Sequence, residues 1–532
     1  MAMLIENWFM KKKIIKIALL SLVVILAVVA LIMLWGGSSD KTEKSAKVKK
    51  PKYSNKVYFA GNYIDALPEK PLALIRVRVD KMLEKSEALS NDDLRMMYSA
   101  FGVVLPDKVR KNADAFLNNP SSAGIDISKP LYAGVYQNAS GDNVDIVLAA
   151  SISDKQRFTE VLESVLAEFD YDIVEQKDGL CYVVDNSGTR VVNAVFDNNT
   201  LLCSNADVMN YVSAGGSTLS KNEQYKALSE STDDIAMVSD IDNVLSSGSD
   251  SLQYGGVSKI FADACVEANL DFVAGGAEGV VEVKLQPKYQ VLTNVLKGAT
   301  GKHMKYMPDN AVAIFNFNAD VNVLYDMLPV LFDGLVDKSM IDQYLTDKSF
   351  LNTLSTEYTI AVLPSAFKKA GGDISNCIIA IDDPDKKVLH MLANANLQKM
   401  DTDLYTYRYK VGNRPCTATL GHMEGTLFLI PDARNIDLLP DGSAKRSTWF
   451  NGLEGKEVCI NAAALDENSK AFVPEFLELL DLMQVETVTL DFDNMSRIDM
   501  RLDVADKSRN ILKLISDTFF IQIKDMIPQN IF

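Results

Sequence analysis

A pattern of strands and helices occurs twice in this chain of 532 residues, and it restricts the possible folds more than any other part of the sequence. The first occurrence opens with Ala73 to Val79 and the second with Val312 to Asn318, where apolar residues alternate. Such alternation predicts a strand with one buried face. Five further pairs of segments follow in the same order: Leu131 to Gln137 with Tyr358 to Pro364, Val144 to Ser151 with Cys377 to Asp382, Asn193 to Ser204 with Thr417 to Ile430, Ile235 to Asp240 with Val458 to Ala463, and Glu282 to Leu285 with Asp499 to Leu502.

The spacing between paired segments falls slowly, from 239 residues for the first pair to 217 for the last. Small loop changes after an internal duplication would leave such a drift. Asn199 and Gly425 precede the same Thr-Leu pair, and both residue types tolerate the positive φ of a tight hairpin. Helices are predicted after Asp80, which we expect to cap a helix through Leu83, after Asp154-Lys155, after Asp320 with the run Val323 to Leu335, and after Asp385-Lys386. The second of these helices has one apolar stripe: Phe158, Val161, Leu162, Val165, Leu166 and Phe169.

These patterns predict an α+β fold with two tandem duplicated lobes. Adjacent alternating strands joined by short turns favour antiparallel sheets, with one face covered by amphipathic helices. We expect the first lobe at residues 61–305 and the second at residues 306–532. The segment Gly298 to Asp309 contains Gly, Lys and Pro and is predicted to be the loop between the lobes.

An apolar run, Ile17 to Trp35, lies near the N-terminus. Nineteen helical residues with a rise of about 1.5 Å each reach about 28 Å, close to the thickness of a hydrocarbon core of about 30 Å. The run is apolar on every side, which disfavours a buried core helix. We therefore predict a transmembrane signal anchor at residues 17–35, after a cytoplasmic N-terminus at residues 1–16. A cleaved signal peptide is the alternative, although its apolar region is usually only about 7 to 15 residues long.

Positive charge is concentrated around this run. Residues 1–60 carry eleven Lys against three acidic residues, although the whole chain has a net charge of −17. Lys11, Lys12, Lys13 and Lys16 abut the run and favour a cytoplasmic N-terminus. Six lysines after Trp35 oppose this orientation by count, but large domains translocate with little regard to charge. We predict a single-pass protein of the inner membrane, with a basic flexible tether at residues 36–60 and the large domain on the periplasmic or extracellular side.

The acidic body disfavours duplex nucleic acid as a partner, because phosphates require a basic surface. The membrane is the partner that the apolar run predicts, and an envelope protein or glycan is a further candidate. The sequence leaves the oligomeric state open.

Histidine and cysteine patterns give no catalytic or metal site. The three histidines, His303, His390 and His422, lack metal-ligand spacing, and we expect all three to face solvent. The six cysteines form no CxxC motif and are expected to be small buried thiols: Cys181, Cys203, Cys265, Cys377, Cys416 and Cys459. A bridge between Cys181 and Cys203 across neighbouring strands stays open as an alternative.

Other motifs fail on spacing. The run Gly298-Ala-Thr-Gly301-Lys302 is too short for a phosphate loop, and His303 stands where Ser or Thr would bind magnesium. No GxSxG motif occurs. The acidic runs Asp382 to Asp385 and Asp491 to Asn494 lack the Gly and distal Glu of a calcium loop, so a proline-containing turn and a solvated strand end explain them. We predict no catalytic, cofactor-binding or metal residues and no cofactor.

Three segments carry a resemblance to a known family: PLALIRVRVDKMLEKS at residues 71–86, NNPSSAGIDISKPLYAGVY at residues 118–136, and the strand that ends in ISDKQRF. In these segments the chain resembles an uncharacterised family of Bacteroidota cell-envelope proteins, a domain of unknown function. The resemblance covers most of the chain after residue 60 and implies a surface or periplasmic location. The membrane run without a lipidation cysteine departs from the family's usual lipoprotein pattern. The resemblance carries no catalytic residues.

Two functions follow as hypotheses. The first is a membrane-anchored, non-enzymatic binding or scaffolding module of the cell envelope. The second is an envelope enzyme that uses carboxylates, such as a glycan hydrolase, which requires two carboxyl groups facing each other roughly 5 to 10 Å apart. The missing catalytic constellation favours the first hypothesis.

Overall fold

The fold is known from a computed structural model, which describes residues 62–87, 111–112, 115, 119–137, 144–166, 171–175, 180–185, 188, 190–206, 208–211, 217–241, 260–331, 339, 349–364, 376–393, 397–401, 403–411, 414–432, 449–465 and 484–517. The predicted N-terminal segment, anchor and tether all lie outside these residues. Within them, no helix is both long and apolar enough to cross a membrane.

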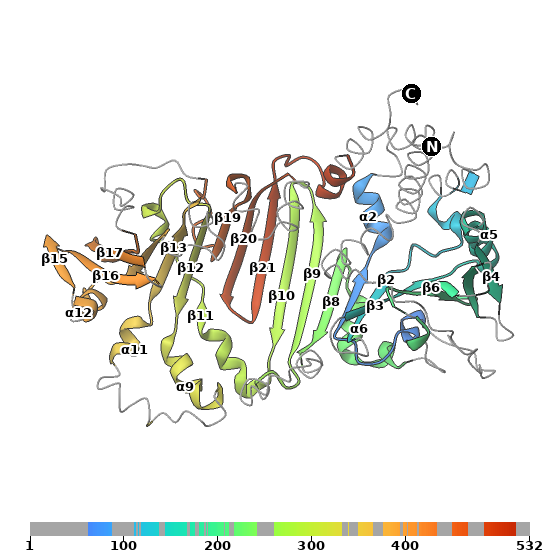
Figure 1. Ribbon diagram of the computed structural model, residues 1–532, viewed down its shortest axis with the longest axis horizontal. Helices are drawn as coiled ribbons and strands as arrows, with labels where there is room; N and C mark the ends of the chain where they lie inside the picture. Colours follow the sequence, from blue (N-terminus) through green and yellow to red (C-terminus); the bar gives the residue numbers. More distant parts are fainter. Residues whose placement is uncertain are drawn as a thin grey trace.

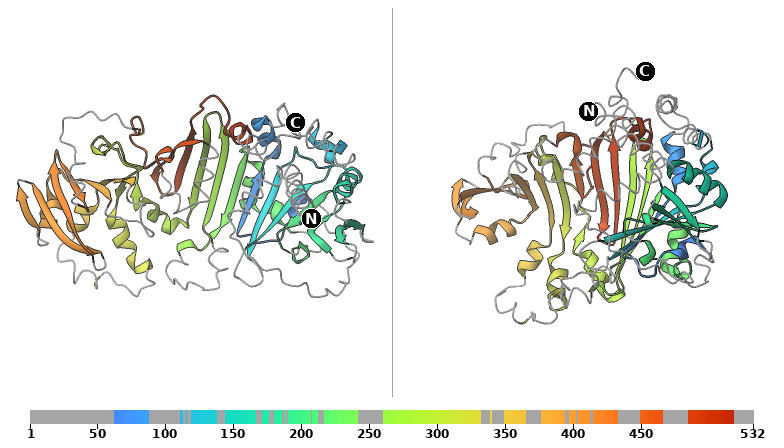
Figure 2. Two further views of the ribbon diagram at one scale, coloured as in Figure 1. Left: turned by 45° about the horizontal axis from the view of Figure 1, so that its top comes forward. Right: turned by 45° about the vertical axis from the view of Figure 1, so that its right-hand side comes forward.

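One sheet of 21 strands dominates the structure, and its named strands pair in antiparallel fashion (Figures 1 and 2). A few short helices accompany it. This architecture confirms the predicted α+β class and the predicted antiparallel pairing.

The strands fall into two series, which we name by residue number. The first half, residues 62–284, contains in spatial order β4 (Tyr171–Glu175), β5 (Cys181–Asp185), β6 (Arg190–Phe196), β7 (Thr200–Ser204), β3 (Val144–Ser151), β2 (Leu131–Gln137), β1 (Ala73–Val77), β8 (Ile235–Asp240), β9 (Cys265–Val273) and β10 (Gly276–Lys284).

The second half, residues 296–517, contains in spatial order β15 (Gln398–Asp401), β16 (Leu404–Val411), β17 (Arg414–Met423), β18 (Thr426–Ile430), β14 (Cys377–Asp382), β13 (Glu357–Val362), β12 (Ala313–Ala319), β19 (Val458–Asn461), β20 (Val485–Asn494) and β21 (Arg497–Val504). The short strand β11 (Leu296–Lys297) pairs with β12 and β20. The order of ten strands is therefore the same in both halves. Each of the six segment pairs identified in the sequence lies in equivalent strands of the two series, although the last pair is out of register, since Glu282 is the seventh residue of β10 and Asp499 the third of β21.

The halves meet where β10 pairs with β21, a contact that we call the seam. Its register runs from Gly276 opposite Asp503 to Glu282 opposite Arg497. The two strands hold the same place in their series and run antiparallel, so a local two-fold axis relates them. Gly279 and Met500, each the fourth residue of its strand, lie opposite each other on this axis. The sheet is thereby continuous from β4 to β15 (Figure 1).

Segments that follow the seam strands cross to the opposite half. After β10, the 3-10 helix η7 (Pro287–Asn294) offers the carbonyl of Thr293 to the amide of Met495 in the β20–β21 turn, at 2.8 Å. After β21, Asn510 forms a bridge to Ala274 in the β9–β10 turn, and Lys513 pairs with Glu87 at 2.7 Å. The crossing is therefore reciprocal, and it adds a second set of contacts to the seam.

Helices pack beside the strands of each half (Figure 1). The α-helices whose first and last residues are both described are α2 (Val79–Ser86), α5 (Lys155–Leu166), α6 (Glu223–Glu230), α9 (Val321–Leu331), α11 (Ser349–Leu354) and α12 (Lys387–Ala393). The further 3-10 helices are η1 (Tyr63–Ala66), η3 (Pro120–Ala123), η5 (Val208–Asn210), η6 (Leu219–Lys221), η8 (Met304–Tyr306) and η11 (Ala462–Ala464). The predicted apolar stripe of α5 is confirmed at Phe158, Val161 and Leu166, which are buried.

One boundary differs from its prediction. The first strand ends at Val77, and Val79 already belongs to α2. Asp80 does not cap this helix, because its carboxylate receives two hydrogen bonds from Arg78 at 2.6 and 2.9 Å. The neighbouring guanidinium competes successfully for the carboxylate, which a cap prediction from residue type alone does not consider.

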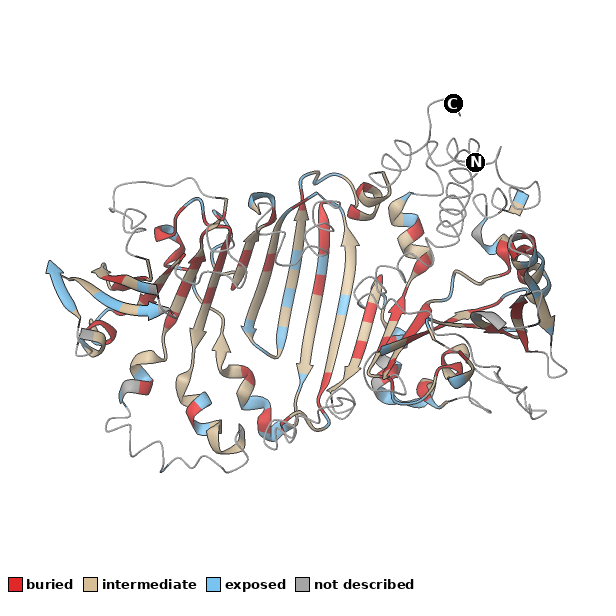
Figure 3. Cartoon of the chain, in the orientation of Figure 1, coloured by how far each residue is buried: buried red, intermediate tan, exposed pale blue. Residues whose placement is uncertain are grey.

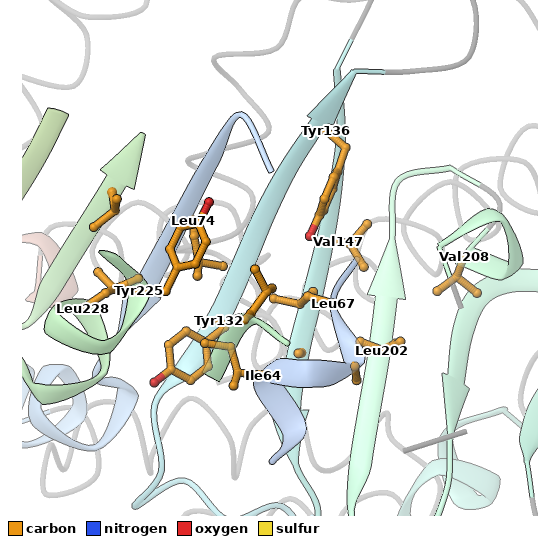
Figure 4. Packing of buried hydrophobic residues seen from close by; sticks show 14 of the residues in the cluster. Ile64, Leu67, Leu74, Tyr132, Tyr136, Val147, Leu202, Val208, Tyr225 and Leu228 are labelled. Carbon is orange, nitrogen blue, oxygen red and sulfur yellow. The ribbon is translucent and has the colours of Figure 1, made fainter. Parts of the chain in front are cut away.

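Each half has its own core, shown as buried residues in Figure 3. In the first half, Ile64 from η1 and Leu67 just after it pack with Leu74, Tyr132 and other apolar residues on one face of the sheet (Figure 4). In the second half, η8 and the residue after it contribute in the same way: Met304, Tyr306 and Met307 pack with Ile314 and Phe428. The segment predicted as the loop between the lobes thus packs into the core of the second half.

Candidate functional site

Two buried carboxylates hold equivalent places in the two halves. Asp234, just before β8, accepts a hydrogen bond from the amide of Phe272 at 2.8 Å. Glu457, just before β19, accepts one from the amide of Phe492 at 2.7 Å. Both carboxylates are almost fully buried. Since β8 pairs with β9 as β19 pairs with β20, these are the same contact made twice. Lys85 neutralises Asp234 at 2.5 Å.

A second buried polar position is shared but carries different residues. Arg76 on β1 and Asn316 on β12 are both buried and face equivalent positions of β2 and β13, and each donates a hydrogen bond to a backbone carbonyl just before β8 or β19. Arg76 Nη1 reaches the carbonyl of Asp233 at 3.3 Å, and Asn316 Nδ2 reaches that of Lys456 at 2.7 Å. Asn316 also accepts a bond from Thr359 at 2.8 Å. The first half therefore buries a cation where the second half buries a neutral amide.

The glycine-containing loop at residues 298–302 binds carboxylates of its own chain. The amide of Gly301 donates to Glu357 at 3.0 Å, and the Thr300 hydroxyl donates to the same carboxylate. The amide of Ala299 donates to Glu457 at 3.3 Å. Burial raises the pKa of Glu457. Backbone amides that a phosphate loop would offer to phosphate are thus already engaged, in agreement with the failed spacing of this motif.

The prediction that all three histidines face solvent is wrong for His303. This residue is 2% exposed, and its Nδ1 lies 3.2 Å from the hydroxyl of Thr426. Its Nε2 has no hydrogen-bond partner. Burial lowers the pKa of His303, while the nearby carboxylate of Glu357 partly opposes this effect. His303 was predicted to face solvent because the surrounding Gly and Lys suggested a surface loop. The two buried glutamates instead bind this loop and hold it in the interior.

The prediction is also wrong for His422, whose side chain is 5% exposed. Its Nε2 lies 2.7 Å from the carbonyl of Asp383. The carboxylate of Asp383 is buried as well and accepts bonds from the amides of Val388 and Leu389 at the start of α12. In the first half, apolar Ile152 and Phe196 occupy the equivalent positions and share one core cluster. The third histidine, His390, is exposed as predicted.

The acidic runs have structural partners. Asp382 pairs with Lys302 at 2.8 Å, Asp385 pairs with Lys387 at 2.9 Å, and Asp491 pairs with Lys456. Among the described residues, no group of three or more His, Cys, Asp or Glu is placed to hold a metal ion.

The suggested bridge between Cys181 and Cys203 does not fit the strand order. Cys181 lies on β5 and Cys203 on β7, and β6 separates these two strands. They are therefore not on neighbouring strands. Cys181, Cys265 and Cys459 are buried, as expected of small apolar thiols, whereas Cys203, Cys377 and Cys416 are half-buried. Burial raises the pKa of Cys459 to about 12.

The hairpin prediction holds for one of its two residues. Gly425 adopts φ +77°, as a tight turn requires. Asn199 is absent from the described residues with positive φ, and its turn is held by Asp197, whose carboxylate accepts from the amides of Asn199 and Thr200. The two turns nevertheless occupy equivalent places in the two halves. The amide of Ile152 donates to the carbonyl of Asn199, and the amide of Asp383 donates to the carbonyl of Gly425.

The central strands expose one charged face. Polar residues alternate along β10 and β21, and the exposed positions appear as pale blue bands in Figure 3. Across the seam, Arg497 pairs with Glu282 at 2.8 Å and Arg501 pairs with Glu278. This face of β9, β10, β20 and β21 also carries Glu267, Asn269, Asp271, Thr487, Thr489, Asp491, Asp499 and Asp503. We call it the seam face, and acidic groups outnumber basic groups on it.

Sequence reasoning missed the seam face and the buried polar positions. β9 was not predicted as a strand, and of β20 only the end at Asp491 to Asn494 was, so their role beside the seam was not foreseen. The register offers one usable signal: Tyr63 to Pro68 and His303 to Pro308 match at a constant spacing of 240 residues, as do Arg76 and Asn316. Extending the duplication to this spacing would have placed His303 in a core segment.

Comparisons with known proteins add little. No family model matches the chain, and no curated protein matches it. Three crystal forms of TP0453 share part of its shape, each with a TM-score of 0.23. Form IV is 10% identical and covers 44% of this chain and 85% of that chain. Form III is 9% identical and covers 44% and 87%, and form I is 10% identical and covers 43% and 80%. At this TM-score the likeness carries no argument.

Proposed function

We propose that this protein is a membrane-anchored, non-enzymatic binding or scaffolding module of the cell envelope. Its helix at residues 17–35 would hold the body at the inner membrane, and the tether at residues 36–60 would place it on the periplasmic or extracellular side. The resemblance to Bacteroidota cell-envelope proteins agrees with this location.

The body consists, in this proposal, of two duplicated lobes. The identical order of ten strands supports a duplication, and so does the repeated contact between a buried carboxylate and a phenylalanine amide. The segments that directly follow β10 contact the second half: η7 bonds to the β20–β21 turn, and β11 pairs with β12. The lobe boundary is therefore better placed near residue 285 than near residue 305.

The observation that carries the proposal is the seam face. It lies on a continuous sheet formed by both halves, and the paired strands hold its charged groups in fixed register. A rigid surface of this kind is suited to binding a partner with little ordering cost. Acidic excess on the face favours a partner with a basic surface.

The carboxylate-dependent enzyme has less support. Four buried carboxylates would be the natural candidates for shifted acid–base groups: Asp234, Glu357, Asp383 and Glu457. Each of them accepts hydrogen bonds from backbone amides, and the amides fix loops, strands or a helix start. This structural role explains why the four carboxylates are buried, and a catalytic role is not needed to explain it.

Site-specific photo-crosslinking in intact cells tests the proposal. A photoreactive residue at Asp499 or Glu278 on the seam face should capture one discrete envelope component, and the same residue at exposed Val144 should not. The charge reversal Glu282→Lys, which removes an acidic group that would attract a basic partner, should reduce the capture at Asp499. Protease added to spheroplasts should digest the body. Equal capture at Val144, or a body protected from protease, would contradict the proposal.

A further inference from the structure

Arg76 is a buried cation without a counter-charge among the described residues. It is 3% exposed, and it shares one face of β1 with Leu74. Its register partners on the flanking strands are Tyr132 and Ala236. The guanidinium bonds to the carbonyl of Asp233 at 3.3 Å and to the side chain of Tyr132, while its Nε has no partner.

Nearby acidic groups do not neutralise Arg76. At this end of β1 and β8, Asp80 is held by Arg78 at 2.6 Å, and Asp234 by Lys85 at 2.5 Å. No carboxylate of the described residues forms an ion pair with Arg76 itself. A buried charge without a partner is strongly unfavourable. Removing one partner of a buried ion pair, which leaves such a charge, is among the most destabilising changes known in protein cores.

The second half shows that the fold does not need this cation. Arg76 faces Tyr132 on β2, and Asn316 faces Thr359 at the equivalent place on β13. Toward β8 and β19 the registers differ, because Arg76 faces Ala236 whereas the amide of Asn316 bonds to the carbonyl of Glu457. Asn316 has both ends of its amide bonded, so this place can hold a neutral side chain with its polar atoms satisfied. The positive charge and the unused N–H of Arg76 call for a reason other than folding.

We propose that Arg76 is the centre of a binding site for a small oxyanion, namely a carboxylate or phosphate group. A guanidinium presents N–H groups in a planar fork that is suited to either group, and the Nε–H of Arg76 is the one that the described residues leave unbonded. Tyr132 adds a hydroxyl beside it, and the ring of Tyr63 packs against that of Tyr132 at 5.5 Å. The Tyr63 hydroxyl itself is engaged with the carbonyl of Pro130 at 2.5 Å. This site lies on the core face of the first half and is independent of the proposed seam-face function.

Thermal unfolding of the full-length protein tests the site. The wild-type protein is titrated with inorganic phosphate, acetate or chloride at matched ionic strength. We expect a saturable rise in Tm of about 3 °C at saturation with phosphate or acetate and none with chloride. A response to phosphate alone would identify a phosphate ligand, and a response to acetate alone a carboxylate ligand. A wild-type Tm that responds equally to chloride would overturn the proposal.

Substitutions of Arg76 locate the effect. Arg76→Asn installs the residue of the second half and should abolish the anion response, while leaving the Tm without anion at or above the wild-type value. Arg76→Lys keeps the charge but loses the fork, so its anion response should be reduced. The matched control Arg501→Asn removes an exposed arginine and should respond like the wild type. An undiminished anion response in both Arg76 variants would overturn the proposal, and the wild-type titration decides the matter if neither variant folds.

Discussion

The two halves keep one buried contact and change the residues around it. In both, a carboxylate before the strand next to β1 or β12 accepts a hydrogen bond from a phenylalanine amide. Around this contact, the first half has Arg76 and an apolar pair of Ile152 and Phe196, whereas the second half has Asn316 and a polar pair of Asp383 and His422. The shared contact identifies what the fold requires. The differing positions identify where each half is free to specialise.

The largest effect on stability is expected for substitutions at the seam, where the two halves meet. A Cβ atom at Gly276 would overlap the carbonyl oxygen of Leu502 on the facing strand, and backbone cannot yield as a side chain can. Gly276→Val should therefore lower the free energy of unfolding by about 3 kcal/mol or more. Urea unfolding followed by tryptophan fluorescence measures this, because Trp449 packs against the core of the second half.

Gly279→Ala is the control for this substitution. Its added methyl meets the flexible end of Met500 at 3.0 Å, so the loss should be about 1 kcal/mol. Wild-type stability of Gly276→Val would show that the pairing of β10 with β21 contributes little.

Removing the shared carboxylates tests whether the halves are energetically equivalent. Glu457→Leu and Asp234→Leu each leave a phenylalanine amide without an acceptor, and Asp234→Leu also frees Lys85. Each should cost about 3 kcal/mol of unfolding free energy, and the amide variants Glu457→Gln and Asp234→Asn about 1 kcal/mol. Chemical denaturation of the four variants is the measurement. A loss of unfolding free energy for the variants of only one half would show that the two contacts are not energetically equivalent.

Acid should act more strongly on the second half because of His303. Burial lowers its pKa below the ordinary value of 6.5, so the unfolded chain binds a proton more readily than the folded chain. The stability contribution is complete above pH 6.5 and is lost as the pH falls further, by at most about 1.4 kcal/mol per pH unit. Glu357 and Asp382 face the ring and moderate the effect, whereas Lys302 and Lys305 add to it.

Urea unfolding at pH 7 and pH 5 measures this dependence. His303→Gln should remove part of the acid sensitivity, and His390→Gln, at an exposed position, should retain all of it. The same pH dependence in both variants would exclude His303 as the source.

The smallest effect is expected for the charges of the seam face. Arg501 and Glu278 are both about half exposed, and exposed ion pairs contribute little in water. Arg501→Gln should change the free energy of unfolding by about 0.5 kcal/mol or less, and the difference should vanish at high salt. Denaturation at low and high salt checks this. A loss above about 1 kcal/mol would assign the seam charges a structural role.

Much of the sheet was accessible from the sequence because alternation and helix periodicity are local signals. The segments beginning at Ala73, Leu131 and Ile235 became strands, and so did their counterparts in the second half. The helix α5 appeared with its expected buried stripe. Such features depend on which residues lie next to one another in the chain.

The rest depends on contacts between distant residues. The burial of His303 follows from Glu357 and Glu457, which lie far along the chain and bind the backbone of residues 299–301. The seam requires β10 and β21 to meet, and no local pattern specifies this pairing. The seam face was missed for the same reason, since β9 was not predicted as a strand and only the last residues of β20 were.

The charges at the seam also disfavour association between copies of this chain during synthesis. β10 contributes the acidic residues Glu278 and Glu282 to the seam face, while β21 contributes Arg497 and Arg501. During synthesis β10 is complete long before β21 leaves the ribosome, so its free edge is exposed to other nascent chains. Two such edges would bring four carboxylates together without the arginines that pair with them, and their repulsion would disfavour association. The cation of β10 itself, Lys284, is paired with Glu267 on β9, so the later strand of the same chain supplies the arginines that pair with Glu278 and Glu282.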